Sequence, residues 1–181
     1  MILFFGPPGS GKSVQGQLLV ARNGWSWLST GQLFRDSGDP EVQARLATGE
    51  LISDDMTNKL LDDALATVKD KANIVLDGYP RNPAQAKWLT GHLPKHGREI
   101  VAVVVFEVSP EELVKRLSGR GRAEDSVEVI ERRLKIYEQQ TQPVLEYYKQ
   151  QNVPICTVDG HGSVGAVHDR IQAAVEACAL A

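Results

Sequence analysis

A glycine-rich segment with one lysine lies near the start of the sequence. Residues 6–13 read GPPGSGKS, which fits the pattern G-x-x-x-x-G-K-[ST]. Glycines let the backbone curl until several N–H groups point at one oxyanion, and a helix that follows adds its positive end. Lys12 can then reach the outer phosphates, and Ser13 a magnesium ion. The segment therefore predicts binding of a nucleoside triphosphate.

A second polar segment follows a buried apolar run. Asp77 ends the run 74–76, and Arg81 lies four residues later on a turn shaped by Gly78 and Pro80. A carboxylate beside the phosphate segment can hold the water ligands of magnesium. A guanidinium on the turn can bind a phosphate in bidentate fashion. The alternative is that Asp77 caps the turn and that Arg81 lies on a solvated face.

Positive charges gather in the second half of the chain, with no acid among them: Lys115, Arg116, Arg120 and Arg122. Arg116 and Arg120 stand one helical turn apart, and such like-charge pairs are unfavourable by a few tenths of a kcal/mol unless an anion relieves them. The spacing predicts a bound anion, which Arg133 can join. The alternative is pairing with nearby acids, namely Glu112, Glu124 or Asp125.

These residues need a scaffold, and the apolar pattern predicts one. Strand-like runs at 2–5, 25–28, 73–76, 100–108 and 154–158 alternate with helical stretches. Five strands with helical crossovers predict an α/β fold, a three-layer, doubly wound, five-stranded parallel sheet of the P-loop nucleoside triphosphate hydrolase type. Ligands collect at the carboxyl ends of such strands. The glycine-rich segment, Asp77 and the residues after Asp159 all fall there.

The helical stretch after Asp125 carries a stripe of larger side chains spaced three and four residues apart. The stripe consists of Val127, Ile130, Leu134, Tyr137, Thr141, Val144 and Tyr148. We expect it to be buried in the core.

Composition narrows the class of protein. The chain has 181 residues, 42% hydrophobic and 24% charged, which are values for one globular domain with no membrane helix. A net charge of −3 argues against a nucleic-acid surface. Because the glycine-rich segment begins at Gly6, we expect no cleavable signal and a cytoplasmic location. Cys156 and Cys178 form no C-x-x-C pair, so we expect reduced thiols and no cysteine metal site.

Five segments, taken in order, resemble those of the adenylate kinases, within the nucleoside monophosphate kinases. They are 6–15 (G-x-P-G-x-G-K-x-x-Q), 29–35 (S-T-G-D-x-x-R), 49–54, 76–85 (L-D-G-[FY]-P-R-x-x-x-Q) and 159–162. The resemblance covers essentially the whole chain. It implies reversible phosphoryl transfer from Mg-ATP to AMP, giving two ADP by direct in-line transfer. It also implies a monomer without nucleic-acid or membrane partners.

The resemblance also implies roles for individual residues. The catalytic residues would be Lys12, Arg81, Arg120, Arg122 and Arg133. ATP would be bound by Gly9, Ser10, Gly11, Lys12, Ser13, Val14, Arg116 and Gly162. AMP would be bound by Thr30, Arg35, Glu50, Ile52, Gly78, Arg81, Gln85, Arg122 and Arg133. Magnesium would lie on Ser13 and Asp77, partly through water, with no zinc. Within a single domain, 1–181, residues 30–59 would form a monophosphate-binding insertion and 116–126 a very short lid.

Three departures from the family pattern stand out. Gln32 replaces an acid, and Val14 replaces a common threonine, so a hydroxyl near the α-phosphate is lost. Only Gly121 separates Arg120 from Arg122, so we expect a lid that is little more than a turn, without a β-hairpin. Such a lid excludes water less completely, which predicts a raised ATP hydrolysis side reaction.

Two other functions stay open at this point. One is a kinase that prefers UMP or CMP, against which Thr30 argues, because the pyrimidine enzymes tend to carry alanine there. The other is a nucleotide-binding regulator with little turnover, which the three departures favour. Retention of Lys12, Asp77 and the arginines argues against that second alternative.

Overall fold

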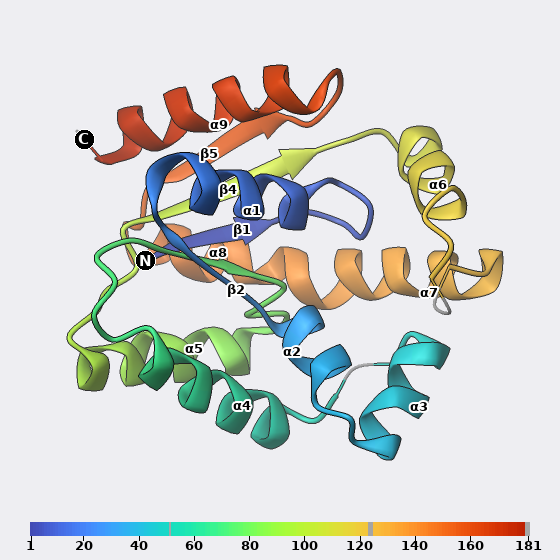
Figure 1. Ribbon diagram of the computed structural model, residues 1–181, viewed down its shortest axis with the longest axis horizontal. Coiled ribbons are helices and arrows are strands. Elements are labelled where there is room, and N and C mark those ends of the chain that lie inside the picture. Colours follow the sequence, from blue (N-terminus) through green and yellow to red (C-terminus); the bar gives the residue numbers. More distant parts are fainter. Residues whose placement is uncertain (51, 123–124, 180–181) are drawn as a thin grey trace.

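A computed structural model describes residues 1–50, 52–122 and 125–179. In this part of the chain the strands are β1 (Ile2–Phe5), β2 (Ser26–Ser29), β3 (Ile74–Asp77), β4 (Ala102–Glu107) and β5 (Ile155–Asp159). They form one parallel sheet in the order β2-β3-β1-β4-β5 (Figure 1). The predicted five-stranded parallel fold is confirmed, and every strand lies within two residues of its predicted bounds.

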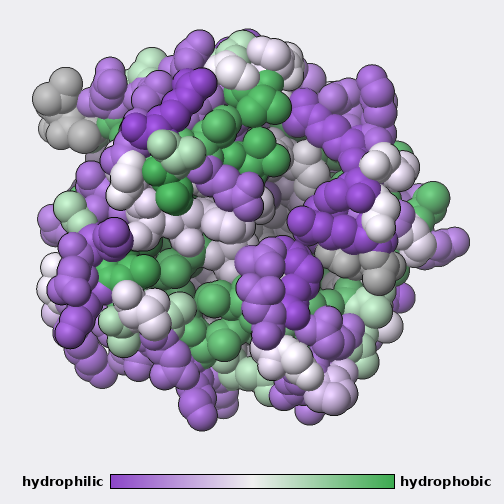
Figure 2. Space-filling model, viewed as in Figure 1, coloured by the Kyte–Doolittle hydropathy of each residue, from purple (hydrophilic) through white to green (hydrophobic). Residues whose placement is uncertain are grey.

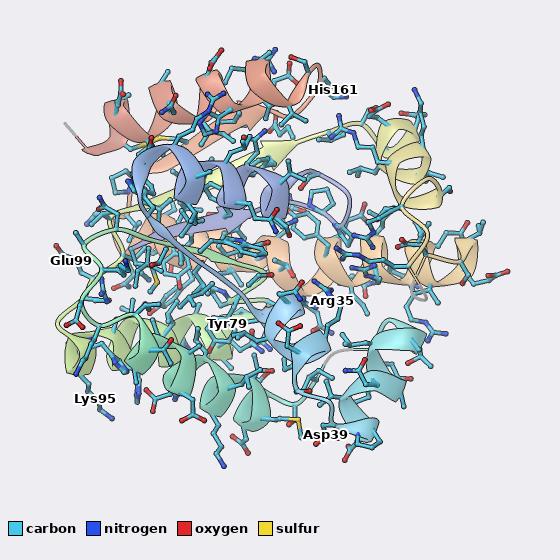
Figure 3. The ribbon with its side chains drawn as sticks, in the orientation of Figure 1. Arg35, Asp39, Tyr79, Lys95, Glu99 and His161 are labelled. Atoms are coloured by element: carbon cyan, nitrogen blue, oxygen red, sulfur yellow. A yellow bond between two sulfur atoms is a disulfide. The ribbon has the colours of Figure 1, made fainter. Side chains whose placement is uncertain are left out.

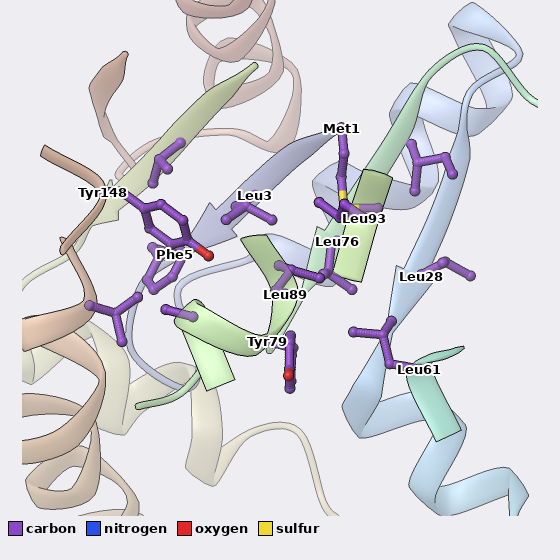
Figure 4. Packing of buried hydrophobic residues seen from close by; sticks show 14 of the residues in the cluster. Met1, Leu3, Phe5, Leu28, Leu61, Leu76, Tyr79, Leu89, Leu93 and Tyr148 are labelled. Carbon is purple, nitrogen blue, oxygen red and sulfur yellow. The ribbon is translucent and has the colours of Figure 1, made fainter. Parts of the chain in front are cut away.

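Helices cover both faces of the sheet. The helices α1 (Lys12–Asn23) and α9 (Val164–Ala179) pack on one face, and α4 (Asp54–Thr67), α5 (Pro83–His92) and α8 (Gln142–Gln150) pack on the other. Successive side chains of a strand point to opposite faces of the sheet. Because helices cover both faces, the side chains on both sides of β1 are buried. Leu3 and Phe5 join the α5–α8 side, while Ile2 and Phe4 join the α1–α9 side. Figure 4 shows Phe5 beside Tyr148 of α8 in the first of these clusters.

A smaller unit projects from the carboxyl edge of the sheet. It consists of α2 (Thr30–Asp36), α3 (Pro40–Thr48) and the start of α4. Phe34, Val42 and Ile52 form a core of their own there, separate from the two clusters of the sheet. Figure 1 places α2 and α3 across from α7 (Val127–Ile136). The unit therefore forms one wall of the space above the strands.

The opposite wall comes from α6 (Pro110–Ser118) and α7, which continues through the π-helical turn η2 (Tyr137–Thr141) into α8. Between α6 and α7, residues 119–122 and 125–126 form a turn without a strand. The predicted stripe is buried at four positions, Ile130, Thr141, Val144 and Tyr148. The prediction of burial is wrong for Val127, which is 58% exposed. Val127 is the first residue of α7 and lies beside the turn, where no neighbouring element covers it.

The expectation of reduced thiols is also wrong. A disulfide joins Cys156 of β5 to Cys178 of α9. The helix α9 runs back along β5, so residues 22 positions apart come side by side. Their spacing in the sequence carries no sign of this, because the pairing depends on how the last helix packs.

No helix in residues 1–50, 52–122 and 125–179 is long and apolar enough to cross a membrane.

Candidate active site

The phosphate loop, residues 6–13, connects the end of β1 to the start of α1. Gly9 and Gly11 have φ angles of +86° and +97°, in the left-handed region that favours glycine. A Cβ atom at Gly9 would also lie 2.9 Å from the Leu117 side chain. Gly11 is the residue before α1, whose first turn carries no acid. The loop amides and the positive end of α1 therefore face the same space, which suits an anion.

Lys12 folds back over this loop. Its ammonium donates hydrogen bonds to the carbonyl oxygens of Gly6 at 2.7 Å and Pro7 at 2.9 Å, and to Ser10 Oγ at 3.2 Å. Desolvation lowers the pKa of Lys12 to about 8; the Asp77 carboxylate opposes the shift, and nearby arginines add to it. The negative charge of a phosphate nearby would stabilise the charged ammonium form of Lys12.

Asp77 and Ser13 are in direct contact beside the phosphate loop. In the sheet Asp77 pairs with Phe4 of β1 and Ser29 of β2, so its carboxylate lies next to the phosphate loop. Ser13 Oγ donates to Asp77 Oδ2 at 2.6 Å, and Asp77 is only 3% exposed. A hydroxyl and a carboxylate are hard oxygen donors, which fit Mg²⁺.

The turn after β3 holds Arg81 toward the same space. Arg81 Nε donates to the Gly78 carbonyl at 2.8 Å, and Thr30 Oγ1 donates to the same oxygen at 2.9 Å. Desolvation lowers the pKa of the Arg81 guanidinium. The Arg81 amide donates to Gln85 Oε1 at 2.7 Å, while Gln85 Nε2 donates to Asp54 Oδ1 at 2.8 Å. Gln85 therefore fixes the backbone that carries Arg81.

Asp125 lies at the turn between α6 and α7, in contact with neighbouring arginines. The Arg120 guanidinium donates to both of its carboxylate oxygens, at 2.9 and 2.5 Å, and Arg133 lies 3.8 Å away. The Arg122 amide adds a hydrogen bond at 3.0 Å. Although desolvation opposes it, the contact with Arg120 holds the pKa of Asp125 below its usual range. The Arg120 and Arg133 guanidinium groups thus lie at the same carboxylate.

Arg116 is held by an acid of its own helix. Its Nε donates to Glu112 at 2.8 Å and its Nη2 to the Gly160 carbonyl at 3.0 Å. The sequence left pairing with acids open as the alternative to anion binding. Two such pairs are present, Arg116 with Glu112 and Arg120 with Asp125. The third acid considered, Glu124, lies outside the described residues. Such pairs still leave the arginines beside the phosphate loop.

Most of these groups line one cleft of about 510 Å³. Figure 2 shows the surface hollowed near the centre of this view, and Figure 3 shows Arg35 pointing in from α2. The lining includes most of the predicted residues: Gly9, Ser10, Gly11, Lys12, Ser13, Val14, Arg35, Glu50, Asp77, Gly78, Arg81, Arg116, Arg120, Arg122, Arg133 and Gly162. Thr30, Ile52 and Gln85 are buried behind the lining instead.

Comparison with known proteins identifies the family of this chain. The family model described as adenylate kinase matches residues 4–153. Curated adenylate kinases of Mycobacterium ulcerans (strain Agy99) and Mycobacterium tuberculosis (strain ATCC 25618 / H37Rv) are each 42% identical over 175 residues, 93% of this chain and 95% of the relative. The chain belongs to the adenylate kinase family. An adenylate kinase of Mycolicibacterium paratuberculosis (strain ATCC BAA-968 / K-10) is 40% identical over the same length.

Membership of the adenylate kinase family confirms the predicted function. The chain is a nucleotide-binding transferase that moves a phosphoryl group reversibly between ATP and AMP. The two alternatives, a pyrimidine monophosphate kinase and a regulator with little turnover, are not favoured. The relatives are covered over 95% of their length, so they are close to this adenylate kinase in size.

The sequence pattern missed part of the site of this adenylate kinase. Ile136 and Tyr137 line the cleft without having been predicted to. Tyr137 stood in the apolar stripe, and the π-helical turn carries it to the cleft wall. Asp54, the partner of Gln85, follows the helix cap Ser53 and so resembled an ordinary acid of a first helical turn. Neither Tyr137 nor Asp54 carries a local sequence signal that distinguishes a residue of the site from one with a purely structural role.

Proposed function

We propose that this adenylate kinase transfers the γ-phosphoryl group of Mg-ATP in line to an AMP phosphate oxygen, using charge and alignment alone. The AMP phosphate is already ionised, so the reaction needs no protein base and no covalent intermediate. One observation carries the proposal, namely that the phosphate loop, Asp77 and the arginines of four separate segments line a single cleft.

On the ATP side, we assign the phosphates to the loop amides of Gly9 to Val14 and to Lys12. The Lys12 ammonium would exchange its carbonyl contacts for phosphate oxygens, whose negative charge offsets its desolvation in the loop. Arg116 and Gly162 would flank the ATP base, since Arg116 already bonds Gly160 in the loop that carries Gly162.

Ser13 and Asp77 would hold magnesium, partly through water, because they are hard oxygen donors in contact beside the loop. When bound, the ion supplies positive charge to the phosphate oxygens. Asp77 accepts the Ser13 hydroxyl hydrogen bond, which fixes both oxygens at the mouth of the loop.

On the AMP side, Arg35 and Arg81 would bind the acceptor phosphate, and Thr30 would orient the Gly78 carbonyl against Arg81. Glu50 lies at the cleft wall and Ile52 behind it, near where the adenine would lie. Gln85 holds the Arg81 amide, and to read adenine it would have to exchange its bond to Asp54.

The transferring phosphoryl group would be stabilised by Arg120, Arg122 and Arg133 together with Lys12. The side chains of Arg120 and Arg133 contact the Asp125 carboxylate, and a phosphate that carries more negative charge can replace this carboxylate. Residues 30–59 would act as the AMP-binding insertion and 116–126 as the lid of a monomeric cytoplasmic enzyme.

Initial rates of phosphoryl transfer test the acceptor. We expect transfer from Mg-ATP to AMP to exceed that to UMP, CMP or GMP, with each acceptor omitted in a control. Transfer to a pyrimidine monophosphate alone would overturn the assignment of AMP. Negligible turnover in both the wild type and a Lys12→Met variant would instead favour the regulator.

The role of Arg81 has its own test. Arg81→Ala should lower kcat by about 10²–10³, the usual loss for one transition-state donor. Arg22→Ala is the matched control, because Arg22 is exposed in the last turn of α1 and does not line the cleft. An equal loss in both variants would contradict the assignment.

A further inference from the structure

Three ligand-bearing side chains converge away from the cleft. His92 Nε2 and His96 Nε2 each lie 2.7 Å from the same atom, Asp62 Oδ1. Within residues 1–50, 52–122 and 125–179, they form a group whose three ligand atoms all lie within 4.8 Å of one another. None of the three residues lines the cleft, so phosphoryl transfer gives them no role.

Two neighbouring helices build this cluster. Asp62 stands in the middle of α4, His92 ends α5, and His96 ends the short helix η1 (Leu93–His96) that follows. A spacing of four residues places both imidazoles on one side of this helical stretch. Tight packing fixes the His92 ring, which stacks on Trp88 with centroids 4.3 Å apart and planes 15° from parallel.

We propose that Asp62, His92 and His96 form a binding site for a first-row transition metal ion of the zinc class, which ties α4 to α5. Two imidazoles and one carboxylate suit Zn²⁺, Co²⁺, Ni²⁺ or Cu²⁺, whereas Mg²⁺ and Ca²⁺ prefer an all-oxygen set. The same three-ligand set, with water in the fourth position, is a common zinc arrangement.

The two nitrogen–oxygen distances need little change to hold an ion. Ligands about 2.0–2.2 Å from a tetrahedral ion lie about 3.3 Å from one another, so the two nitrogens must move apart from Asp62 Oδ1 by well under 1 Å. Rotation about the exposed Asp62 side chain, 43% accessible, can supply this movement. The imidazoles are 17% and 16% exposed, which leaves them anchored while a water completes the ion's shell.

The site would complete a polar seam between α4 and α5. At the start of α4, Asp54 accepts hydrogen bonds from Asn82 and Gln85 of the α5 segment. Asp62 lies eight residues, about 12 Å, further along α4. An ion there would fix the far end of the same interface, and so hold α4 in place behind the AMP side of the cleft.

The sequence alone carries no clear signal of this site. His92 and His96 show a metal-ligand spacing, but two histidines alone are common on a helix. Asp62 lies thirty residues earlier, and only the packing of α4 on α5 brings it to them.

Metal binding is tested on protein without a histidine tag, stripped with EDTA and dialysed. Added Co²⁺ should give the visible absorption bands of a tetrahedral nitrogen–oxygen site, and Cu²⁺ should quench the fluorescence of the stacked Trp88. Zn²⁺ at 100 times its Kd should raise the Tm by about 5–10 °C, while Mg²⁺ at the same concentration should not.

Variants locate the ion. His92→Gln, His96→Gln and Asp62→Asn should each abolish the Co²⁺ bands and the Zn²⁺ shift, with circular dichroism confirming that they fold. His161→Gln is the matched control for a histidine beside an acid, since His161 contacts Asp159 at 2.7 Å, and it should keep the full response.

The Trp88→Phe variant should lose the Cu²⁺ quenching of fluorescence and keep the Zn²⁺ shift in Tm. Absence of Co²⁺ bands in the wild type, or their persistence in the His92 and His96 variants, would overturn the proposal.

Discussion

At the scale of single residues, Lys12 links the packing of the phosphate loop to the pH dependence of catalysis. Its ammonium is held by three loop oxygens and is desolvated there, which lowers its pKa from 10.5 to about 8. Above that pH the free enzyme loses the charge that attracts phosphate. ATP binding favours the ammonium form, so the pKa rises in the complex.

We therefore expect kcat/KM for ATP to fall as the pH rises through about 8, while kcat at saturating ATP falls only at higher pH. The measurement is a rate profile from pH 6 to 9.5 with saturating AMP. Lys12→Arg should remove the break, because a guanidinium stays charged over this range. A break that persists in Lys12→Arg would assign it to another group.

At the scale of elements, the close approach of α1 to β2 sets the position of the phosphate loop. Gly16 of α1 faces Trp27 of β2, and a Cβ atom at Gly16 would lie 2.6 Å from Trp27 Nε1. Any larger residue must push the helix away from the strand. The helix begins directly at the loop, so this contact also fixes the direction of the helix N-terminus toward the phosphates.

Gly16→Ala should therefore destabilise the protein by about 1–3 kcal/mol through overpacking. Gly91→Ala is the matched substitution, since Gly91 of α5 has open space around its Cα, and it should stabilise by about 0.5 kcal/mol through helix propensity. Urea unfolding of the three proteins gives both values from the midpoints. Equal effects of the two alanines would show that helix propensity outweighs the Trp27 contact.

Elements and loops could be predicted from sequence wherever the signal is local or periodic. The five strands, the glycine-rich loop and the Asp77–Arg81 turn each carry their pattern within a few residues. Contacts made by tertiary packing carry no such pattern, as the Cys156–Cys178 bond and the Asp54–Gln85 pair show. Exposure at the end of a helix, as at Val127, depends likewise on which neighbours the fold supplies.

At the scale of the whole molecule, the cleft lies between two walls of unequal size. One wall is the unit of α2, α3 and the start of α4, with its own core. The other consists of α6, α7 and the turn between them, where Asp125 contacts Arg120 and Arg133. We expect a turn of this size to offer little surface to cover a bound triphosphate, which would let water reach the γ-phosphate.

We expect a measurable release of ADP from Mg-ATP alone, above that of adenylate kinases with long lids. The assay follows ADP formation without AMP, and Lys12→Met provides the background of protein that does not catalyse transfer. A rate that equals this background would show that the short lid excludes water well enough.

The last helix leads the chain away from the reaction. Val164 and Val167, at the start of α9, line the cleft, and the sixteen residues of α9 then run about 24 Å back along the sheet. Figure 1 places the described C-terminal end at the opposite side of the molecule from α6 and α7. A fluorescent protein or a surface anchor fused beyond α9 would therefore leave the entrance for nucleotides open, so the enzyme can be tethered for single-molecule work through this end.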